Sequence, residues 1–324
     1  MTAPSKPLRT RVCDVLGVDA PILQAGMSTF TSAELVAAVS NAGGLGILGA
    51  LLRPVDELRA EIRRIRTLTT RPFGVNHVIA HLDPTALDVT LEERVPVLSL
   101  AWGDPAPLAA RAHAAGLRVV HQVATVAAAA EAAAAGVDVI VGQGTDGGGH
   151  VGFVGTIALL PAVVDAARGI PVVAAGGIAD GRGLAAALAL GAEGVLMGTR
   201  FLATPEAPIP DAWRRAIVAA DGSATVRTAA FDRAVAMPWP GAEVRAIRNA
   251  FLGEWAARAD DAGEHAGELG PRLMQALVTG DFDVFPPMAG QSCGIVGEIL
   301  PAAEIVRRTI DDATAVLRRL ATLA

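Results

Sequence analysis

Eight short runs rich in valine, isoleucine and leucine recur along the first part of the chain, and this recurrence constrains the fold more than any other feature. Apolar positions within the runs are nearly continuous, which is typical of parallel strands that are buried on both faces. The expected strands are PILQAG (21–26), LGILGA (45–50), FGVNHVI (73–79), VPVLSLAW (95–102), RVVHQV (118–123), VDVIVGQG (137–144), PVVAAGG (171–177) and GVLMGT (194–199).

Helix-forming segments separate these runs, and several of them end in glycine just before the next strand, as a helix C-cap does. The expected helices lie in residues 32–43, 54–66, 83–94, 105–116, 125–136, 158–169 and 181–191. A doubly wound sheet usually has about five to seven strands, whereas a (β/α)8 barrel has eight strand–helix units. We therefore predict an α/β fold of the TIM-barrel type.

The pattern changes after the eighth run, where no further strand–helix units follow. Helices are expected in residues 211–220, 242–259 and 268–280, joined by polar and proline-rich stretches. We predict that residues 205–287 form a helical cap subdomain over the barrel mouth. Residues 1–204 and 288–324 then form the barrel, with its closing helix in the final segment.

Charge and cysteine content exclude several classes of protein. The net charge of −6, from 27 basic and 33 acidic residues, gives no basic surface for nucleic acid or an anionic membrane. Two cysteines, Cys13 and Cys293, are too few for a disulfide scaffold, a thiolate zinc site or a cysteine-held iron–sulfur cluster, and we predict no metal site. The N-terminus lacks the apolar core of a secretory signal, so we expect a cytoplasmic protein.

The longest step between strands contains a glycine-dense loop, GQGTDGGGHVGFVGT (142–156), before the sixth helix. Barrel enzymes carry their chemistry on the loops after the strands, so this loop is a candidate site. His150 lies in it, and histidine titrates near neutral pH, which suits proton transfer. We predict that His150 is catalytic, that His121 near the end of the fifth strand faces the pocket, and that the other histidines are structural.

Glycines at the ends of the seventh and eighth strands predict a phosphate site. Gly176 and Gly177 follow the seventh strand, and Gly198 and Thr199 follow the eighth. Bare glycine lets main-chain amides approach an anionic oxygen, and these two loops form the usual phosphate cradle of such barrels.

Uncharged polar side chains occur at other strand ends, namely Gln24, Met27 (a thioether), Asn76 and Gln143. Amide side chains match the donors and acceptors along one edge of an isoalloxazine ring. FMN has one phosphate and fits better than a dinucleotide, because the GxGxxG fingerprint after the first strand is missing.

Seven motifs in order resemble those of the nitronate monooxygenase family, formerly called 2-nitropropane dioxygenases, which are FMN-dependent TIM barrels. The motifs are PILQAGM (21–27), GGLGILGA (43–50), FGVN (73–76), GQGTDGGGHVG (142–152), VVAAGGIADGRG (172–183), GVLMGTRF (194–201) and AGQSCGIVGEILPAAEIV (289–306). They run through nearly the whole chain.

The resemblance implies a role for each matching residue. It places Met27, Asn76, Gln143 and Gly148 against the flavin, uses Gly177, Met197, Gly198 and Thr199 to hold the phosphate, and makes His150 the active-site histidine. Family members often read EAGGH in the loop, where this chain reads TDGGGH, so the acidic group moves to Asp146. We assign Trp102, His121 and Asp146 to the substrate pocket, and expect Asp146 to act on the pKa of His150 if it lies within hydrogen-bonding reach.

The resemblance implies FMN-dependent oxidation of alkyl nitronates by O2 to a carbonyl compound and nitrite, with a small molecule and O2 as partners. One alternative is an NAD(P)H-dependent FMN reductase acting on enoyl thioesters or quinones, which shares the barrel, the histidine loop and the late AGQ segment. A second alternative is a flavin- or phosphate-binding barrel without redox turnover. The sequence leaves the physiological substrate and the oligomeric state open.

Overall fold

Eight parallel strands form the centre of the molecule in a computed structural model that describes residues 8–323. Their order around the sheet is β1-β9-β8-β6-β5-β4-β3-β2, and every pair along it is parallel. The bounds are β1 (Ile22–Gln24), β2 (Gly46–Gly49), β3 (Phe73–Val78), β4 (Val97–Ala101), β5 (Arg118–Val123), β6 (Val139–Gln143), β8 (Val172–Ala175) and β9 (Val195–Met197). All eight predicted strands are present, and the TIM-barrel prediction is confirmed.

The barrel closes at a seam between β1 and β2. One isolated bridge joins Leu23 of β1 to Leu45, the residue before β2, with two main-chain hydrogen bonds of 2.9 Å between Leu45 and β1. The side chain of Gln24 extends this pairing, because its Oε1 accepts from the Ile47 amide at 3.0 Å and its Nε2 donates to the Ile47 carbonyl at 3.2 Å. A fully buried side-chain amide therefore takes the place of further main-chain ladder bonds beyond Leu45.

Helices cover the outside of the barrel where the sequence predicted them, including the segment after β3. The Asp83 side chain caps that helix by accepting from the Thr85 and Ala86 amides. Gly116 and Gly136 have φ values of 82° and 73°, as the predicted glycine ends require. The helices are α2 (Ala33–Asn41), α3 (Val55–Leu68), α4 (Pro84–Glu92), α5 (Ala106–Ala114), α6 (Val126–Ala134), α7 (Thr156–Ala166), α8 (Gly181–Ala189) and the closing α15 (Ala302–Ala321).

Short elements occupy the two ends of the barrel. At the N-terminal side lies α1 (Arg11–Leu16), while η1 (Ser28–Phe30), η2 (Ile79–His81) and α9 (Thr199–Leu202) follow β1, β3 and β9. The AGQ segment returns to the barrel in η4 (Gln291–Ile295). The C-terminal strand ends are therefore covered by short turns and helices from several parts of the chain.

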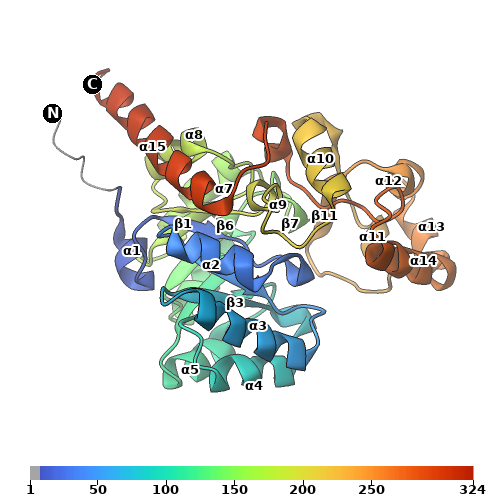
Figure 1. The fold of residues 1–324 in the computed structure, drawn as a ribbon, viewed down its shortest axis with the longest axis horizontal. Helices are drawn as coiled ribbons and strands as arrows, with labels where there is room; N and C mark the ends of the chain where they lie inside the picture. Colours follow the sequence, from blue (N-terminus) through green and yellow to red (C-terminus); the bar gives the residue numbers. More distant parts are fainter. Residues whose placement is uncertain (1–7, 324) are drawn as a thin grey trace.

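Residues 205–287 lie to one side of the barrel, opposite the side where α1 lies (Figure 1). They hold both helices and strands: α10 (Asp211–Ala219), η3 (Gly222–Ala224), β10 (Thr225–Thr228), α11 (Ala230–Ala234), β11 (Glu243–Ile247), α12 (Ala250–Trp255), α13 (Ala259–Glu264) and α14 (Ala266–Thr279). We call this stretch the inserted segment. Its status as a separate subdomain stays a prediction.

The predicted helix over residues 242–259 is wrong in its first half, which is strand β11. This strand pairs antiparallel with β10 on one side and with β7 (Gly149–Val151) on the other. Val244 lies opposite His150 in that register. Long-range pairing outweighs local helical preference here, and it joins the glycine-dense loop to the inserted segment.

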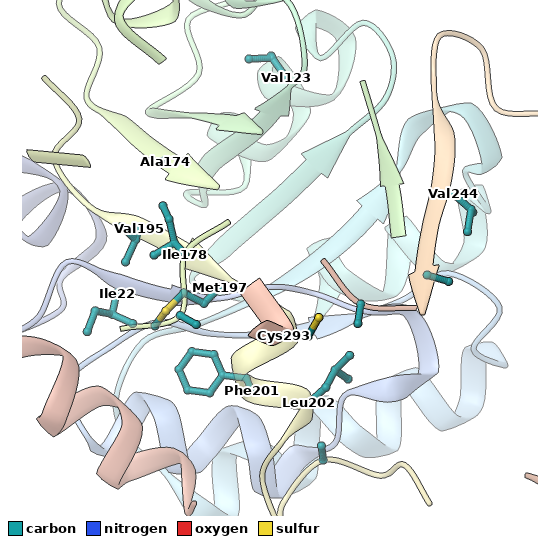
Figure 2. Close-up of a cluster of buried hydrophobic side chains, with 14 of the residues drawn as sticks. Ile22, Val123, Ala174, Ile178, Val195, Met197, Phe201, Leu202, Val244 and Cys293 are labelled. Carbon is teal, nitrogen blue, oxygen red and sulfur yellow. The ribbon is translucent and has the colours of Figure 1, made fainter. Parts of the chain in front are cut away.

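The outer faces of the strands and the helices enclose the main hydrophobic core. Figure 2 shows Ile22, Val195 and Met197 from the strands close to Phe201 of α9 and Cys293 of η4. A second cluster fills the barrel interior, with Leu23, Val97, Val120, Val139, Val141 and Val173 among its members. Alternate residues of each strand therefore face the helices or the barrel axis, which decides which side chains can reach the mouth.

No helix within residues 8–323 is long and apolar enough to cross a membrane. The prediction about a secretory signal concerns the first residues of the chain, and residues 1–7 lie outside the described range. The cytoplasmic location stays a prediction.

Candidate active site

A cavity opens at the C-terminal ends of the barrel strands and continues under the inserted segment. Loops after β1, β3, β4, β6, β8 and β9 contribute to its wall, as expected for a barrel enzyme. The predicted site residues that line it are Met27, Asn76, Trp102, Gln143, Gly148, His150, Gly176, Gly177, Gly198 and Thr199. Most of the predicted site is thus brought together from distant parts of the sequence.

Glycines form the end of the cavity between the loops after β8 and β9. Gly176 and Gly177 have φ values of 98° and 73°, a conformation that favours glycine. Thr199 accepts a hydrogen bond at its Oγ1 from the Gly290 amide at 2.9 Å, which ties the returning AGQ segment to this end. A Cβ atom on Gly148 would overlap the Gly290 amide, so the two segments need glycine to meet.

The surroundings of Gly198 indicate whether the glycine-lined end of the cavity suits a ligand. Its φ of −105° is open to any residue, and a Cβ there would make only ordinary contact with Met27 Sδ at 3.4 Å. Packing within the protein therefore does not demand glycine at this position. Bare main chain facing a cavity fits a bound phosphate group, as the sequence predicted.

Uncharged amides line the floor of the cavity near the strand ends. Asn76 Nδ2 donates to Ser99 Oγ at 3.1 Å, and Gln122 Nε2 donates to Gln143 Oε1 at 3.1 Å. Ser99 and Gln122 also line the cavity and were not predicted. Their inward positions follow from the strand alternation, which could have identified them. The set offers donors and acceptors without charge, and it fits the polar edge of a flavin ring.

His150 lies in β7 with two partners from the inserted segment. Its Nε2 is 2.8 Å from Asp232 Oδ1, and the two side chains are 13% and 5% exposed. The Trp239 ring stacks on the imidazole with centroids 3.4 Å apart and planes 9° apart. Asp232 is on α11 and Trp239 is on the loop that follows. Neither was predicted, because no local motif marks them.

Burial lowers the pKa of His150 below its ordinary value, because the charged imidazolium loses its hydration. Asp232 opposes this shift through its hydrogen bond and its charge, and the nearby His81 adds to it. His81 lies beside Trp239, with ring centroids 4.9 Å apart. A neutral imidazole at neutral pH can accept a proton, which suits a general base.

Trp102 lies at the end of β4, as predicted, and faces Trp239 edge-on at a centroid distance of 6.2 Å. Its φ of 58° is unusual for a bulky side chain. Such backbone conformations cluster at ligand sites, where surrounding contacts hold them.

Three of the predicted site residues face away from the cavity. His121 is 2% exposed on the helix-facing side of β5, and burial lowers its pKa to about 4. Its neighbour Gln122 faces the cavity instead. Met197 is packed in the outer core (Figure 2), and Gln24 is bound at the barrel seam. The prediction that the His121 side chain faces the pocket is wrong. The side chains of Gln24 and Met197 do not line the cavity either, and their contacts with the cofactor stay predictions.

Asp146 is also outside the cavity wall. Its Oδ2 accepts from the Thr156 amide at 2.7 Å, at the first residue of α7, so the carboxylate caps a helix. The prediction that it lies in the substrate pocket is wrong. The carboxylate within hydrogen-bonding reach of His150 is Asp232.

A sequence model described as nitronate monooxygenase matches residues 9–86 and 78–312. The chain belongs to the nitronate monooxygenase family. A probable nitronate monooxygenase of Staphylococcus aureus is 33% identical over 334 aligned residues, covering 88% of this chain and 92% of that protein. The family resemblance drawn from the seven motifs is confirmed, and the chain is a flavin-dependent oxidoreductase of this family.

Two solved structures share the whole architecture. FabK from Thermotoga maritima has 36% identity and a TM-score of 0.89, covering 98% of this chain and 99% of its own. Nitroalkane oxidase from Streptomyces ansochromogenes has 31% identity and a TM-score of 0.85, covering 96% of this chain and all of its own.

A further relative is named for a coenzyme A thioester. The 5-hydroxy-7a-methyl-1-oxo-octahydro-1H-indene-4-carboxyl-CoA dehydrogenase of Mycobacterium tuberculosis is 44% identical over 228 residues, or 69% of this chain. The match spans 64% of that relative's length, which is less than two thirds. The names of these relatives thus refer to nitro compounds in two cases and to a carboxyl-CoA in another.

Proposed function

We propose that this protein is an FMN-dependent oxidoreductase that acts on an apolar acyl thioester, with NAD(P)H-dependent reduction of an enoyl thioester as its reaction. The observation that carries this proposal is the chemistry of the cavity wall. Among residues 8–323, no arginine or lysine lines the cavity, and burial favours the neutral form of His150. A neutral thioester suits this wall better than a nitronate anion, which needs a positive partner.

The part of the cavity under the inserted segment is apolar and aromatic. Phe30 and Trp213 pack edge to face with centroids 4.8 Å apart, and Phe231 meets Phe285 at 5.5 Å. These four side chains line the cavity together with Leu202, Met274, Leu277 and Met288. A long or cyclic hydrocarbon body can bury its surface there. A short nitroalkane has too little apolar surface to fill this part of the cavity.

The similar proteins support the same substrate class. FabK, an enoyl reductase, shares nearly the full length of this chain at 36% identity. The relative at 44% identity is named for a carboxyl-CoA substrate with a fused-ring body. An acyl thioester as the substrate class agrees with both names.

FMN is the cofactor that we propose for the cavity. The main chain at Gly176, Gly177 and Gly198 would hold its phosphate, and the amides of Asn76 and Gln143 would meet the polar edge of its ring. Bound there, FMN supplies hydride chemistry next to the thioester. The protein's own part is to orient the acyl body, exclude water under the inserted segment and exchange a proton through His150.

Nitronate oxidation is the second candidate function. The family model and the Staphylococcus aureus relative carry that name, and a neutral His150 could take a proton from a nitroalkane. The two candidates differ in the source of electrons. A nitronate is itself the reductant, whereas an enoyl thioester must be reduced by electrons from a nicotinamide.

An anaerobic flavin titration separates the two. The FMN-loaded protein is mixed with NADH or NADPH, and flavin absorbance near 450 nm is followed; an enoyl-CoA is then added, and in parallel propyl-2-nitronate is given to oxidised protein. We expect bleaching by a nicotinamide and recovery of colour with the enoyl-CoA. Bleaching by nitronate with nitrite formed in air, and none by either nicotinamide, would favour the second candidate. No bleaching by any of them would favour a barrel without redox turnover.

A further inference from the structure

We propose that Asp232 of the inserted segment is a positioning residue, which holds the ring proton of His150 at Nε2 and leaves Nδ1 as the nitrogen that exchanges a proton with the substrate. The contact that carries this inference is the 2.8 Å distance between His150 Nε2 and Asp232 Oδ1. An ionised carboxylate only accepts hydrogen bonds, so Nε2 must donate. In neutral imidazole the other nitrogen, Nδ1, is then the acceptor.

The surroundings leave the imidazole little freedom. Trp239 covers one face of the ring in a nearly parallel stack. Antiparallel pairing between β7 and β11 fixes the backbone of His150 opposite Val244. Asp232, with a side chain 5% exposed, then sets the rotation of the ring and the position of its proton. A histidine oriented by a carboxylate in this way is a recurring arrangement in enzymes on unrelated folds.

Other charged groups near His150 are engaged elsewhere or act weakly. Glu243 and Arg245 flank Val244 on β11, but Glu243 pairs with Arg227 and Arg245 donates to the Thr145 carbonyl at 2.9 Å. His81 of η2 acts on His150 only through space and lowers its pKa. Asp232 is the acidic group that raises the pKa of His150. Removing its charge should therefore move the pKa of His150 further down.

The inference rests on the proposed function for the identity of the substrate. In enoyl-thioester reduction His150 would first take up a proton from solvent at Nδ1, and the imidazolium would then pass that proton to the carbon next to the carbonyl. FMN, when bound, would supply hydride chemistry at the other carbon. The carbon–carbon double bond becomes single, and the protonated imidazole returns to the neutral Nε2–H form that Asp232 stabilises. In the reverse direction the same nitrogen would remove that proton.

The test uses FMN-loaded protein labelled with 15N-histidine. The six histidines give separate ring signals, and that of His150 is identified by its absence from His150→Asn. At pH values above its titration, we expect wild-type His150 to carry its proton on Nε2 and to show a bare Nδ1. A proton on Nδ1 would overturn the inference. This measurement needs no substrate, so its result tests the inference independently of the proposed function.

Asp232→Asn keeps the shape of the side chain and removes its charge. We expect the His150 titration to move to lower pH, and the enoyl-CoA kcat to fall about 10- to 100-fold with little change in KM, which is less than the 10²–10⁴ expected for loss of a proton-transfer residue itself. The pH limb that depends on protonated His150 should move down with the titration. Asp232→Glu should restore part of the rate, and the flavin absorbance of each variant reports whether it folds.

Asp260→Asn is the matched control. Asp260 lies on α13, is 85% exposed and pairs with Arg233, the residue next to Asp232 on α11. The Asp260→Asn substitution removes a carboxylate from the same part of the inserted segment, at a residue that does not contact His150. We expect its His150 titration and pH profile to match those of the wild type. If Asp232→Asn also matched the wild type in titration and pH profile, Asp232 would be structural only; if the Nε2 proton were present but no acyl thioester reacted, the proposed function would fail and the inference would stand.

Discussion

Gly198 is bare at the cavity although neither its backbone nor its protein neighbours require glycine. Gly198→Val should therefore fold normally but place methyl groups where the phosphate of FMN would lie. Overpacking costs about 1–3 kcal/mol, which corresponds to an FMN Kd weaker by about 5- to 150-fold. Titration of the apoprotein with FMN, followed by flavin fluorescence, measures this change.

A matched control is Gly253→Val on α12, where an added Cβ meets nothing within 4 Å. It should leave the FMN Kd unchanged. Unaltered FMN binding by Gly198→Val would show that the phosphate lies elsewhere.

Two buried histidines that face away from the cavity make stability depend on pH. Burial lowers the pKa of His77 and of His121 to about 4, against 6.5 for the free side chain. Between pH 6.5 and 4 the unfolded chain therefore binds more protons than the folded one, and the free energy of unfolding falls as pH falls. Each histidine contributes on the order of 2–3 kcal/mol to this loss.

His121→Leu should remove its share of that loss. Urea unfolding of the variant at pH 7.5, 5.5 and 4.5 should show a shallower decline than the wild type, by on the order of 2–3 kcal/mol. Substitution of the exposed His265 by leucine provides the comparison and should leave the slope unchanged. Parallel declines in all three proteins would contradict the assignment.

The identity of most cavity residues could be predicted at the residue scale, but the direction of their side chains could not. In β5 the residues around His121 and Gln122 are apolar on both faces, because a parallel strand in a barrel is buried on both faces. The sequence pattern then does not show which alternate residues face the barrel axis and which face the helices. His121 and Gln122 were therefore equally good candidates for the pocket. Met197 and Leu196 pose the same problem in β9, where Leu196 lines the cavity.

At the element scale, the pairing of β11 with β7 is the link between the barrel and the inserted segment. Val244→Pro removes an amide from the central strand of this three-stranded sheet and should release the backbone of His150. We expect turnover to fall at least about 10-fold while FMN stays bound, since the loops proposed to hold its phosphate are on the barrel. Steady-state kinetics and flavin absorbance report the two effects separately.

Val226→Pro gives the matching change on β10, the outer strand, which contacts β11 but not β7. It should cost much less activity. Equal losses in both variants would indicate that the whole inserted segment is destabilised, with no special role for the β7–β11 pair.

Helices and strands were predicted correctly where their own residues determine them, and the prediction failed where an element depends on a distant partner. Strands and helices of the barrel alternate within short stretches, so each could be placed from its own residues. The partner of β11, strand β7, is more than 90 residues away in the sequence. The residues of β11 and the one before it, AEVRAI (242–247), contain no pattern that indicates this partner. Asp232 and Trp239 were missed for the same reason, since their importance comes only from contact with His150.

At the scale of the whole molecule, the end of the cavity proposed for the cofactor and the end proposed for proton transfer come from different parts of the chain. Glycine loops of the barrel form the first, whereas β11, Asp232 and Trp239 of the inserted segment support the second. The family motifs lie almost entirely in the barrel and in the AGQ segment. This explains why the sequence allowed a cofactor to be predicted while it left the substrate open.

The seam closed by Gln24 has a consequence for how the barrel opens. Every other neighbouring pair of strands in the barrel shares a ladder of paired residues. The β1–β2 joint has one isolated bridge at Leu45, with its two main-chain hydrogen bonds, and the Gln24 side-chain amide. Local fluctuations should begin at this joint, so the Leu45 and Ile47 amides should exchange with deuterium sooner than the Val120 and Val141 amides deep in the ladder. Gln24→Leu should hasten exchange at Ile47 about 10-fold or more, because a lost hydrogen bond in a buried setting is worth about 1–3 kcal/mol. The closed sheet is thus expected to open first between β1 and β2.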